Sequence, residues 1–448
     1  MVEKNYLNDE ITKKYADLIR KYAVIDNELY SKYNVKRGLR NADGTGVLVG
    51  LTTVGEVTGY VVMDNEKTPI PGKLSYRGRE IRDIIANLGG RRFSFESVIY
   101  LLLFSEVPND EQLKEFSNLI AGLRELPDNF TEDMILKCPS KNIMNKIARS
   151  VLTLYSYDDN PDCTDVENVL NQAIMLISRL SIFAAYGYQA KKHFYDNKSL
   201  VLHRNNHDFS IAENFLHLIR DNGKFTELEA EVLDLMLVLQ AEHGGGNNST
   251  FTTHVVTSSG TDIYSAVAAS IGSLKGPRHG GANIKVVEML EDLMANVENI
   301  EDSKQIEKYL RDVIAKNAND KTGLVYGMGH AVYTISDPRT VLLREKAKEL
   351  AQEKGEEALK IFNVYSEIER LTPQIINERT NKSICANVDL YSGFVYQMLN
   401  IPKELFTPLF AVSRVAGWCA HIIEEITCNS RIMRPAYKSV TPKKSYNE

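Results

Sequence analysis

Three histidines of this sequence lie in glycine-flanked turns, which present a side chain to a cleft instead of a core. They are His243 in Ala-Glu-His-Gly-Gly-Gly, His279 in Gly-Pro-Arg-His-Gly-Gly-Ala-Asn, and His330 in Gly-Met-Gly-His-Ala-Val-Tyr. Glycine permits tight turns and lets a ligand come close to the backbone. Together with a later carboxylate, Asp389, these imidazoles predict acid–base chemistry on a small polar substrate.

Each of these residues also has an ordinary structural explanation when it is taken alone. A histidine beside glycine is often a surface loop residue, and an aspartate near a helix start is often an N-cap. A metal site is a sharper alternative, but no histidine pair has the i, i+4 spacing of a helical zinc motif and the cysteines do not cluster. We therefore expect no metal. The other histidines are assigned to structure or surface: His193, His203, His207, His217, His254 and His421.

The bulk composition is that of a globular enzyme. A chain of 448 residues is long enough for two or more domains, and its net charge of −6 argues against generic binding to nucleic acid or to an anionic membrane. An anionic substrate must then be held by a local cluster of arginine or lysine. The five scattered cysteines contain no Cys-x-x-Cys and indicate reduced thiols in a cytoplasmic protein. The polar N-terminus predicts no targeting peptide, and the apolar run from Val98 to Phe104 is too short to span a membrane.

The elements that position these residues are expected to be mostly helices. Residues 7–34 predict a charged amphipathic helix or a pair of helices, whereas 47–76 predicts short strands or a hairpin that Pro69, Pro71 and Gly72 end. Further helices are predicted over 96–104, 110–123, 166–194 and 227–242, after His279, and from Asp337-Pro338 to about Gly355, with Pro373 and Pro402 as later breaks. The sequence has no P-loop and no Gly-x-Gly-x-x-Gly after a strand, so nucleotide binding by those two routes is unsupported.

One segment of the chain resembles the signature of the citrate synthase family. It runs from Gly327 to Arg339, and the arginine follows Asp-Pro nine residues after His330, as in the family. Four further segments resemble the family's motifs in the same order: 276–283, 387–393, 410–414 and 431–435. A single such motif would be weak, but five in order, over roughly residues 45–440, are specific.

The resemblance implies a mainly α-helical, two-domain fold with a small β patch near the N-terminus. The large domain is then expected over 1–285 and again over 390–448, and a small, CoA-binding domain over 286–389. His279 and Asp389 would lie near the two crossings between these domains, where a cleft and a hinge are expected.

The resemblance also implies an activity, that of an acyltransferase of the tricarboxylic acid cycle. Acetyl-CoA, as a co-substrate with no further cofactor, would condense with oxaloacetate and water to give citrate and CoA. Asp389 would be the base, His279 the donor to the thioester oxygen and His330 the donor to the ketone oxygen. Further substrate contacts are implied for His243, Arg339, Arg414 and Arg434, the last across the interface of a homodimer with shared active sites. CoA contacts are implied for Gly327, Met328, Gly329 and Asn387.

Alternatives stay open for the substrate and for two of the arginines. A 2-methylcitrate synthase would use propionyl-CoA through the same residues, and one methylene is discriminated by only about 1–3 kcal/mol. A non-catalytic relative would bind only CoA or a carboxylate. Arg339 could be a solvated residue of a first helical turn, and Arg414, inside an apolar helix, could pair with Glu425. Two departures from the family pattern are the run Gly244–Gly246, seemingly one residue longer, and Thr334, where many relatives carry a basic residue.

Overall fold

The computed structural model of the chain describes residues 9–63, 66–428 and 431–445. It divides into two compact units, residues 1–51 and residues 52–448. The expected division into a large domain (1–285 and 390–448) and a small domain (286–389) is a different one and stays a prediction.

The first unit contains two helices and a helical turn, α1 (Asp9–Tyr22), α2 (Asn27–Lys32) and η1 (Arg37–Leu39). Acidic residues begin α1 and basic residues end it, as the helix dipole favours. Asp26 caps α2 by accepting the backbone N–H of Glu28 at 2.9 Å. The predicted pair of helices is thereby confirmed, although positions 7 and 8 lie outside the described residues.

A three-stranded antiparallel sheet begins the second unit, with β1 (Gly55–Met63), β2 (Glu66–Tyr76) and β3 (Arg79–Glu80) in that order. The predicted hairpin is confirmed, but Pro69, Pro71 and Gly72 lie inside β2 instead of ending it. The reason is that β3 pairs only with Ser75 and Tyr76, so the proline-containing part of β2 has a strand on one side alone. A proline without a backbone N–H is tolerated at such an edge.

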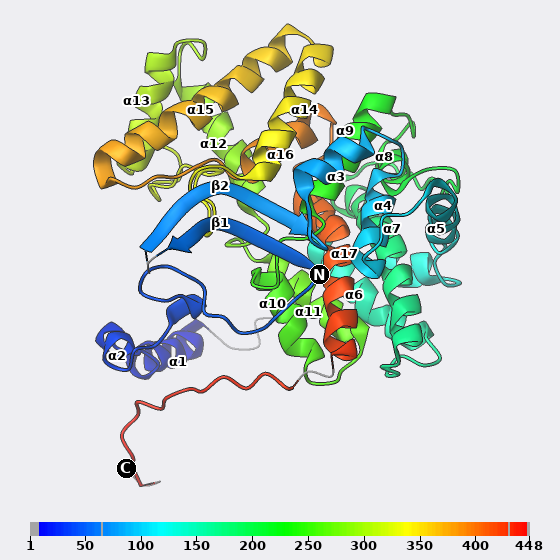
Figure 1. The fold of residues 1–448 in the computed structure, drawn as a ribbon, viewed down its shortest axis with the longest axis horizontal. Coiled ribbons are helices and arrows are strands. Elements are labelled where there is room, and N and C mark those ends of the chain that lie inside the picture. Colours follow the sequence, from blue (N-terminus) through cyan, green and yellow to red (C-terminus); the bar gives the residue numbers. More distant parts are fainter. Residues whose placement is uncertain (1–8, 64–65, 429–430, 446–448) are drawn as a thin grey trace. The chain divides into compact units, whose positions relative to one another are not determined.

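The remaining elements of the second unit are helices (Figure 1). Those before His279 and at the end of the chain are α3 (Ile81–Leu88), α4 (Ser94–Phe104), α5 (Asp110–Gly122), the π-helical turn η2 (Thr131–Leu136), α6 (Ile143–Leu154), η3 (Tyr155–Tyr157), α7 (Val166–Asp196), α8 (Ile211–Ile219), α9 (Glu227–Gln240), α10 (Asn248–Thr257), α11 (Ile263–Lys275), η4 (Lys403–Leu405) and α17 (Phe406–Thr427). The others are α12 (Ala282–Asn296), α13 (Ser303–Ile314), α14 (Pro338–Lys354), α15 (Glu356–Thr380) and α16 (Asp389–Met398).

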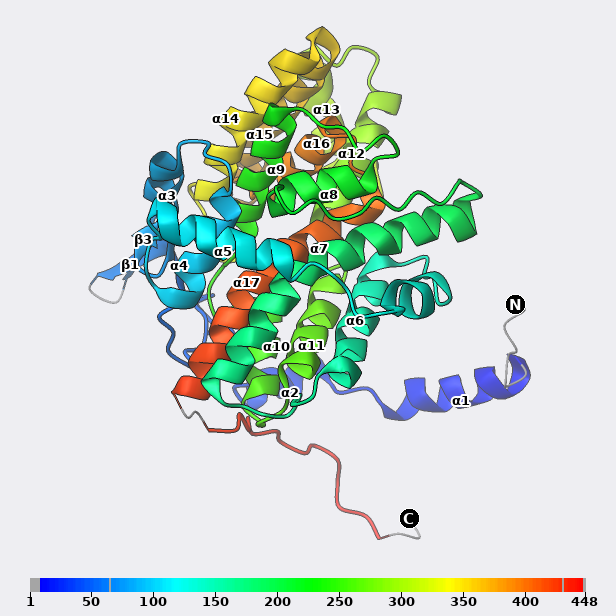
Figure 2. The same cartoon turned by 90° about the vertical axis from the view of Figure 1, so that its right-hand side faces the viewer.

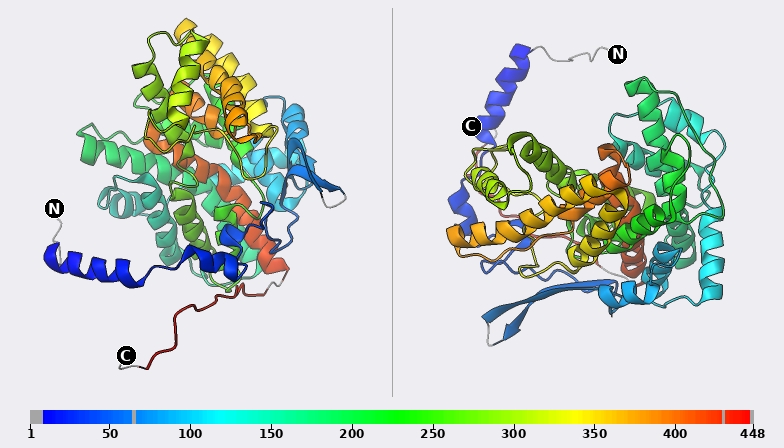
Figure 3. Two further views of the ribbon diagram at one scale, coloured as in Figure 1. Left: turned by 90° about the vertical axis from the view of Figure 1, so that its left-hand side faces the viewer. Right: turned by 90° about the horizontal axis from the view of Figure 1, so that it is seen from above.

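Helix α17 is the central element of the core. It packs on α4, α7, α9, α10 and α11, and Figure 2 shows it running beside α10 and α11. Both α7 and the segment Lys403–Thr427 are long and apolar enough to cross a membrane, although 78% and 94% of their apolar windows are buried inside the protein. Such burial is typical of core helices. The helices α12 to α16 pack largely on one another, and the β1–β2 hairpin is a long ribbon in the right view of Figure 3.

The helix boundaries around the third histidine turn follow the predicted signals. Asp337 caps α14, Pro338 is its first residue, and Gly355 ends it at a φ of 105°. Pro373 was predicted to break the chain but lies inside α15. Buried side chains continue on both sides of this proline, at Leu371 and Ile375, so packing of the helix face outweighs the missing N–H.

Candidate active site

The loop before His330 is tied by its backbone to the segment that leads into α16. The N–H of Gly329 donates to the carbonyl of Cys385 at 2.7 Å, and the N–H of Asn387 donates to the carbonyl of Gly327 at 2.9 Å. The Asn387 side chain adds a bond to the carbonyl of Gly329 at 2.7 Å. Both glycines have φ values, 79° and 91°, that only glycine adopts easily. Two segments far apart in sequence thus form one rigid support.

Asp389 is the first residue of α16 and is half-buried. Its own N–H donates to Asn387 Oδ1 at 3.0 Å, and its carboxylate caps no helix. Desolvation raises the pKa of Asp389 to about 6, although Arg339 and Arg414 act in the opposite direction. The carboxylate is therefore more basic than usual and is still ionised at neutral pH.

The ring of His330 is held by backbone donors and by an aromatic neighbour. The N–H groups of Val332 and Tyr333 both donate to His330 Nδ1 at 3.1 Å. The ring stacks on Tyr333 with centroids 4.5 Å apart, and its Nε2 lies 3.1 Å from His243 Nε2. Because Nδ1 accepts two N–H groups, it carries no proton, and the neutral ring must carry its proton on Nε2.

The β1–β2 hairpin supports this loop from the other side. The N–H of Gly72 donates to the carbonyl of Ser336 at 3.0 Å, and the Tyr333 hydroxyl donates to the carbonyl of Lys73 at 3.2 Å. A Cβ at Gly59 would lie 2.5 Å from the carbonyl oxygen of Val332, and one at Gly72 would lie 2.2 Å from that of Ser336. Glycine at these positions lets the hairpin approach closely enough to fix the turn after His330.

His243 follows α9 and enters a turn at Gly244, whose φ is 81°. Burial lowers the pKa of His243 well below its usual value, and the positive charges of Arg339 and Arg414 lower it further. The His243 ring is therefore neutral. Its contact with His330 brings together two of the predicted residues that are distant in sequence.

His279 is fixed by the start of α10. The N–H of Ser249 donates to His279 Nε2 at 3.3 Å, and the Ser249 hydroxyl lies 3.0 Å from the same nitrogen. That hydroxyl also accepts from Trp418 Nε1 at 3.2 Å, and Asn247 Oδ1 lies 2.9 Å from it. Burial and the charge of Arg414 lower the pKa of His279 to about 4. The ring is neutral, and its proton lies on Nδ1 because Nε2 is an acceptor.

Arg339 is buried and paired, so the alternative of a solvated surface arginine is wrong. It is 3% exposed, and its Nε and Nη2 donate to the two carboxylate oxygens of Asp337 at 3.1 and 2.7 Å. Burial lowers the pKa of Arg339, but the charge of Asp337 more than offsets this and raises it overall. Such a forked ion pair holds the guanidinium in one orientation.

Arg414 lies in the middle of α17 and is only partly paired. Its Nε donates to the carbonyl of Gln240 at 2.7 Å and its guanidinium lies over Phe410, 4.8 Å from the ring centre. Neither Nη1 nor Nη2 has an acceptor among the described residues, and burial lowers the pKa of Arg414 to about 10. The alternative partner Glu425 is wrong, because that carboxylate accepts from His254 Nδ1 at 2.7 Å. The two buried nitrogens Nη1 and Nη2 of this guanidinium therefore indicate a site for an anion.

Arg434 is the predicted residue that the single chain does not bring to the others. It is exposed in the extended segment 431–445. The N–H of the preceding Met433 donates to the Ser258 hydroxyl at 3.1 Å, just beyond α10. The implied contact across a dimer interface stays a prediction.

The sequence of the chain matches a family model. The model described as citrate synthase, C-terminal domain, covers residues 44–436. A citrate synthase of Haloferax volcanii is 34% identical over 407 residues, which are 90% of this chain and 94% of that protein. This chain belongs to the citrate synthase family. It is an enzyme that transfers an acyl group in a condensation.

Further members of the citrate synthase family agree with the fold. The citrate synthase of Thermotoga maritima has a TM-score of 0.72 at 28% identity and covers 92% of this chain and 97% of that one. That of Thermoplasma acidophilum, in a ternary complex with carboxymethyl coenzyme A and oxaloacetate, has a TM-score of 0.74 at 26% identity, with the same coverage. A 2-methylcitrate synthase of Shewanella oneidensis is 30% identical over 373 residues, 83% of this chain and 90% of that protein. The mainly α-helical fold with a small sheet near the N-terminus is confirmed.

Motifs of the citrate synthase family did not identify the residues that hold these groups in place. Ser249 and Tyr333 lie within or next to the motif turns, yet nothing in their spacing shows that they contact the imidazoles. Asp337 was predicted only as an N-cap, which it is, and it is also the partner of Arg339. Asp337 lies two residues before an arginine in the first turn of a helix, and this spacing was the one signal that could have predicted the ion pair.

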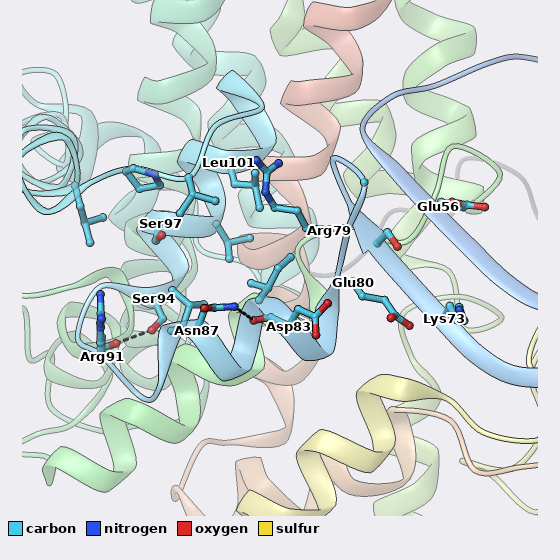
Figure 4. Close-up of a pocket in the computed structure, with 18 of the residues that line it drawn as sticks. Glu56, Lys73, Arg79, Glu80, Asp83, Asn87, Arg91, Ser94, Ser97 and Leu101 are labelled. Atoms are coloured by element: carbon cyan, nitrogen blue, oxygen red, sulfur yellow. Dashed lines mark hydrogen bonds between the residues drawn. The ribbon is translucent and has the colours of Figure 1, made fainter.

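A cavity of about 940 Å³ lies elsewhere in this family member, between the sheet and α3 to α5 (Figure 4). Its walls carry equal numbers of cationic and anionic side chains, so the charges are balanced: Lys73, Arg79, Arg91 and Arg92 against Glu56, Glu80, Asp83 and Asp110. In Figure 4, the Asn87 side chain donates to the backbone carbonyl of Asp83, and the Ser94 hydroxyl donates to the backbone carbonyl of Arg91. None of the predicted site residues lines it. Within 9–63, 66–428 and 431–445, no group of three or more His, Cys, Asp or Glu side chains is arranged to hold a metal ion.

Proposed function

We propose that this chain condenses acetyl-CoA with oxaloacetate and water to give citrate and CoA. The observation that carries the proposal is the protonation pattern of two neutral histidines. Backbone N–H groups occupy Nδ1 of His330 and Nε2 of His279, so the proton of each ring is on the other nitrogen. Both rings are thereby set as hydrogen-bond donors without carrying a charge.

The acetyl group must lose a methyl proton whose acidity is very weak. In the proposal, the Asp389 carboxylate accepts this proton, and its pKa of about 6 makes it a better base than an ordinary aspartate. His279 Nδ1–H donates to the thioester oxygen as negative charge develops on it. A neutral imidazole suits this role because it can donate a hydrogen bond to the enolate oxygen without transferring its proton to that oxygen.

The second substrate must be made electrophilic and oriented. His330 Nε2–H would donate to the ketone oxygen of oxaloacetate and replace its present contact with His243. The enolate carbon then bonds to the ketone carbon while the π pair of the ketone moves to its oxygen, which takes up the His330 Nε2 proton to become a hydroxyl. The proton that Asp389 removed from the methyl group balances this proton, and water hydrolyses the resulting thioester to citrate and CoA. The two open donors of Arg414 support a carboxylate there, while Arg339 is presented by its pair with Asp337.

The CoA contacts are proposed for the backbone-tied loop at Gly327, Met328 and Gly329 and for Asn387. A small domain over 286–389 would carry these groups onto bound oxaloacetate and exclude water from the enolate. Neither a metal nor another cofactor enters the proposed reaction, because imidazole and guanidinium groups face each developing charge. Chelator treatment is expected to leave the rate unchanged, and chelator-sensitive activity restored by one metal ion would contradict this.

The test is a thiol-release assay with oxaloacetate and either acetyl-CoA or propionyl-CoA. We expect a higher kcat/KM with acetyl-CoA. A clear preference for propionyl-CoA would instead favour the 2-methylcitrate synthase, whose relatives include the Shewanella protein at 30% identity. Absence of turnover with both acyl-CoAs would leave only a non-catalytic binder of CoA or carboxylate.

We further propose a cytoplasmic homodimer in which Arg434 completes the partner's site. Its exposed position in the extended segment 431–445 and the free state of all five cysteines support this. Mixing Arg434→Ala chains with Asp389→Asn chains tests it, because a mixed dimer would contain one site with neither defect. Partial recovery of activity is expected, and mixed dimers that form but stay inactive would contradict the shared site.

A further inference from the structure

Four buried side chains form a continuous line next to the turn that carries His243. Glu425 Oε2 lies 2.7 Å from His254 Nδ1, His254 Nε2 lies 3.1 Å from His421 Nδ1, and His421 Nε2 lies 3.2 Å from Glu242 Oε1. We call this line the buried histidine chain. It joins α17 and α10 to the residue that directly precedes His243.

The protons of the buried histidine chain can be counted from its contacts. A carboxylate at each end requires a proton on His254 Nδ1 and another on His421 Nε2. The two nitrogens that face each other at 3.1 Å need one proton between them. The two rings therefore share three protons and one positive charge.

The positive charge belongs mainly to His421. Burial disfavours a charge there, but Glu242 and Glu424 outweigh it and raise the pKa of His421 to about 9. Burial and the charge of His421 lower the pKa of His254, so that ring is the neutral one. Beyond Glu424 lies Arg77, whose Nη1 donates to the Thr53 hydroxyl, which in turn donates to Glu424 Oε1 at 2.7 Å.

Glycines make room for the buried carboxylate of this chain. A Cβ at Gly55 would lie 2.6 Å from Glu242 Cγ, and one at Gly417 would lie 2.3 Å from Glu242 Oε2. Gly245 packs over the two rings, with its Cβ position 3.5 Å from His254 Nε2. Three separate backbone segments are thus shaped around Glu242 and the imidazoles.

Glu242 connects the buried histidine chain to the candidate active site in two ways. Its Oε1 accepts the N–H of Gly244, so it fixes the turn that presents His243. Its charge is also the main favourable influence on the buried Arg414, although the two make no ion pair. An uncompensated Glu242 would attract the guanidinium whose Nη1 and Nη2 have no acceptor among the described residues.

We propose that His421 is a positioning residue that neutralises Glu242, so that Arg414 stays available for a substrate carboxylate and His243 keeps its orientation. The proposal rests on the proposed function, since the carboxylate is that of oxaloacetate. Removing the imidazolium leaves a buried, unbalanced carboxylate beside the anion site. Binding of the dianion would then weaken more than the chemical step.

The test compares His421→Gln with the double variant Glu242→Gln/His421→Gln. For the single variant, the KM and the calorimetric Kd for oxaloacetate are expected to rise about tenfold or more, equivalent to about 1.4 kcal/mol, with a smaller change in kcat. The double variant removes the unbalanced charge and is expected to regain most of this affinity. His217→Gln, at a half-buried histidine of α8, is the matched control. A normal KM in the single variant, or no recovery in the double variant, would overturn the proposal.

A pH series covers the case in which His421→Gln does not fold. In the unsubstituted protein the KM for oxaloacetate is expected to begin to rise as the pH passes about 9, before Arg414, whose pKa is about 10, loses its own charge, and Glu242→Gln is expected to remove that first rise. The same rise in both proteins would overturn the proposal. Arg414→Lys separates this result from failure of the proposed function. If Arg414→Lys also binds oxaloacetate normally, the proposed anion site is wrong. If Arg414→Lys binds oxaloacetate weakly but the His421 variants behave normally, only the proposal for His421 is wrong.

Discussion

Two histidine pairs in this protein have nearly the same geometry and opposite electrostatics. His243 and His330 meet at 3.1 Å in the candidate active site, and His254 and His421 meet at 3.1 Å in the buried histidine chain. Arginines surround the first pair and carboxylates surround the second. Burial disfavours a positive charge in both pairs, and only in the second pair do neighbouring carboxylates outweigh it.

The difference teaches what each pair is suited to do. A neutral pair can donate hydrogen bonds to a polarised oxygen and needs space for a ligand, and accordingly both of its rings are half-buried. A charged pair satisfied by carboxylates at both ends has no capacity for a ligand, and His421 is fully buried. The first is suited to chemistry and the second to holding the first in place.

The largest expected effect comes from removing the carboxylate that we propose as the proton acceptor. Asp389→Asn keeps the shape of the residue and loses its basicity, so kcat is expected to fall by about 100- to 10,000-fold. Glu425→Gln, at the end of the charged pair, is the matched change and should lower kcat far less. Steady-state rates and oxaloacetate Kd values check both. Near-normal turnover in Asp389→Asn would end the assignment of the base.

A smaller effect is expected at the guanidinium that lies between the two pairs. Arg414→Lys keeps a positive charge but replaces the fork by a single ammonium group, so the KM for oxaloacetate should rise by about 10- to 100-fold. Arg92→Lys, in a forked pair with Glu213 at 2.7 Å, controls for the exchange itself. The two variants are compared at one pH and salt concentration. Equal KM values in both would show that Arg414 binds no carboxylate.

The sequence predicted well those features that are set locally. The cap Asp337-Pro338, the terminator Gly355 and the hairpin before Tyr76 depend on neighbours a few residues away. The motif turns predicted His330 and Asp389 as site residues from their types and spacing, and the structure joins the segments that carry them by backbone hydrogen bonds, while their catalytic roles stay predictions.

Features that depend on distant contacts were not predictable in the same way. Pro69 and Pro71 are compatible with β2 only because β3 is short, which no local signal shows. His421 was assigned to structure or surface, and its surface location is excluded by full burial. Its partners Glu242 and His254 come from other helices or turns, so their charges could not be summed from the sequence.

The charged histidine pair and the arginine-rich candidate site should respond to pH in opposite directions. The pKa of His421 is raised to about 9, so its contribution to the free energy of unfolding is full below about pH 6.5 and is lost as the pH rises through 9. The pKa of His279, which shares the arginine-rich site, is lowered to about 4, so its contribution is present above about pH 6.5 and is lost as the pH falls through 4. Urea unfolding between pH 4 and 10 measures both slopes. His421→Gln should flatten only the alkaline slope, and an unchanged alkaline slope would contradict the charged state of that ring.

The smallest expected effect separates the two ways in which Tyr333 supports the neutral pair. Tyr333→Phe keeps the ring stacked on His330 and loses the hydroxyl bond to the carbonyl of Lys73, so the free energy of unfolding should fall by about 0.5–1.5 kcal/mol. Tyr333→Leu also loses the stacked ring, and it should raise the KM for oxaloacetate as well, because the His330 imidazole then loses the aromatic face that helps to fix its orientation. Chemical denaturation and steady-state kinetics measure the two effects separately. If the Phe variant raised the KM as much as the Leu variant, the contact with the hairpin, rather than the ring, would be what orients the imidazole.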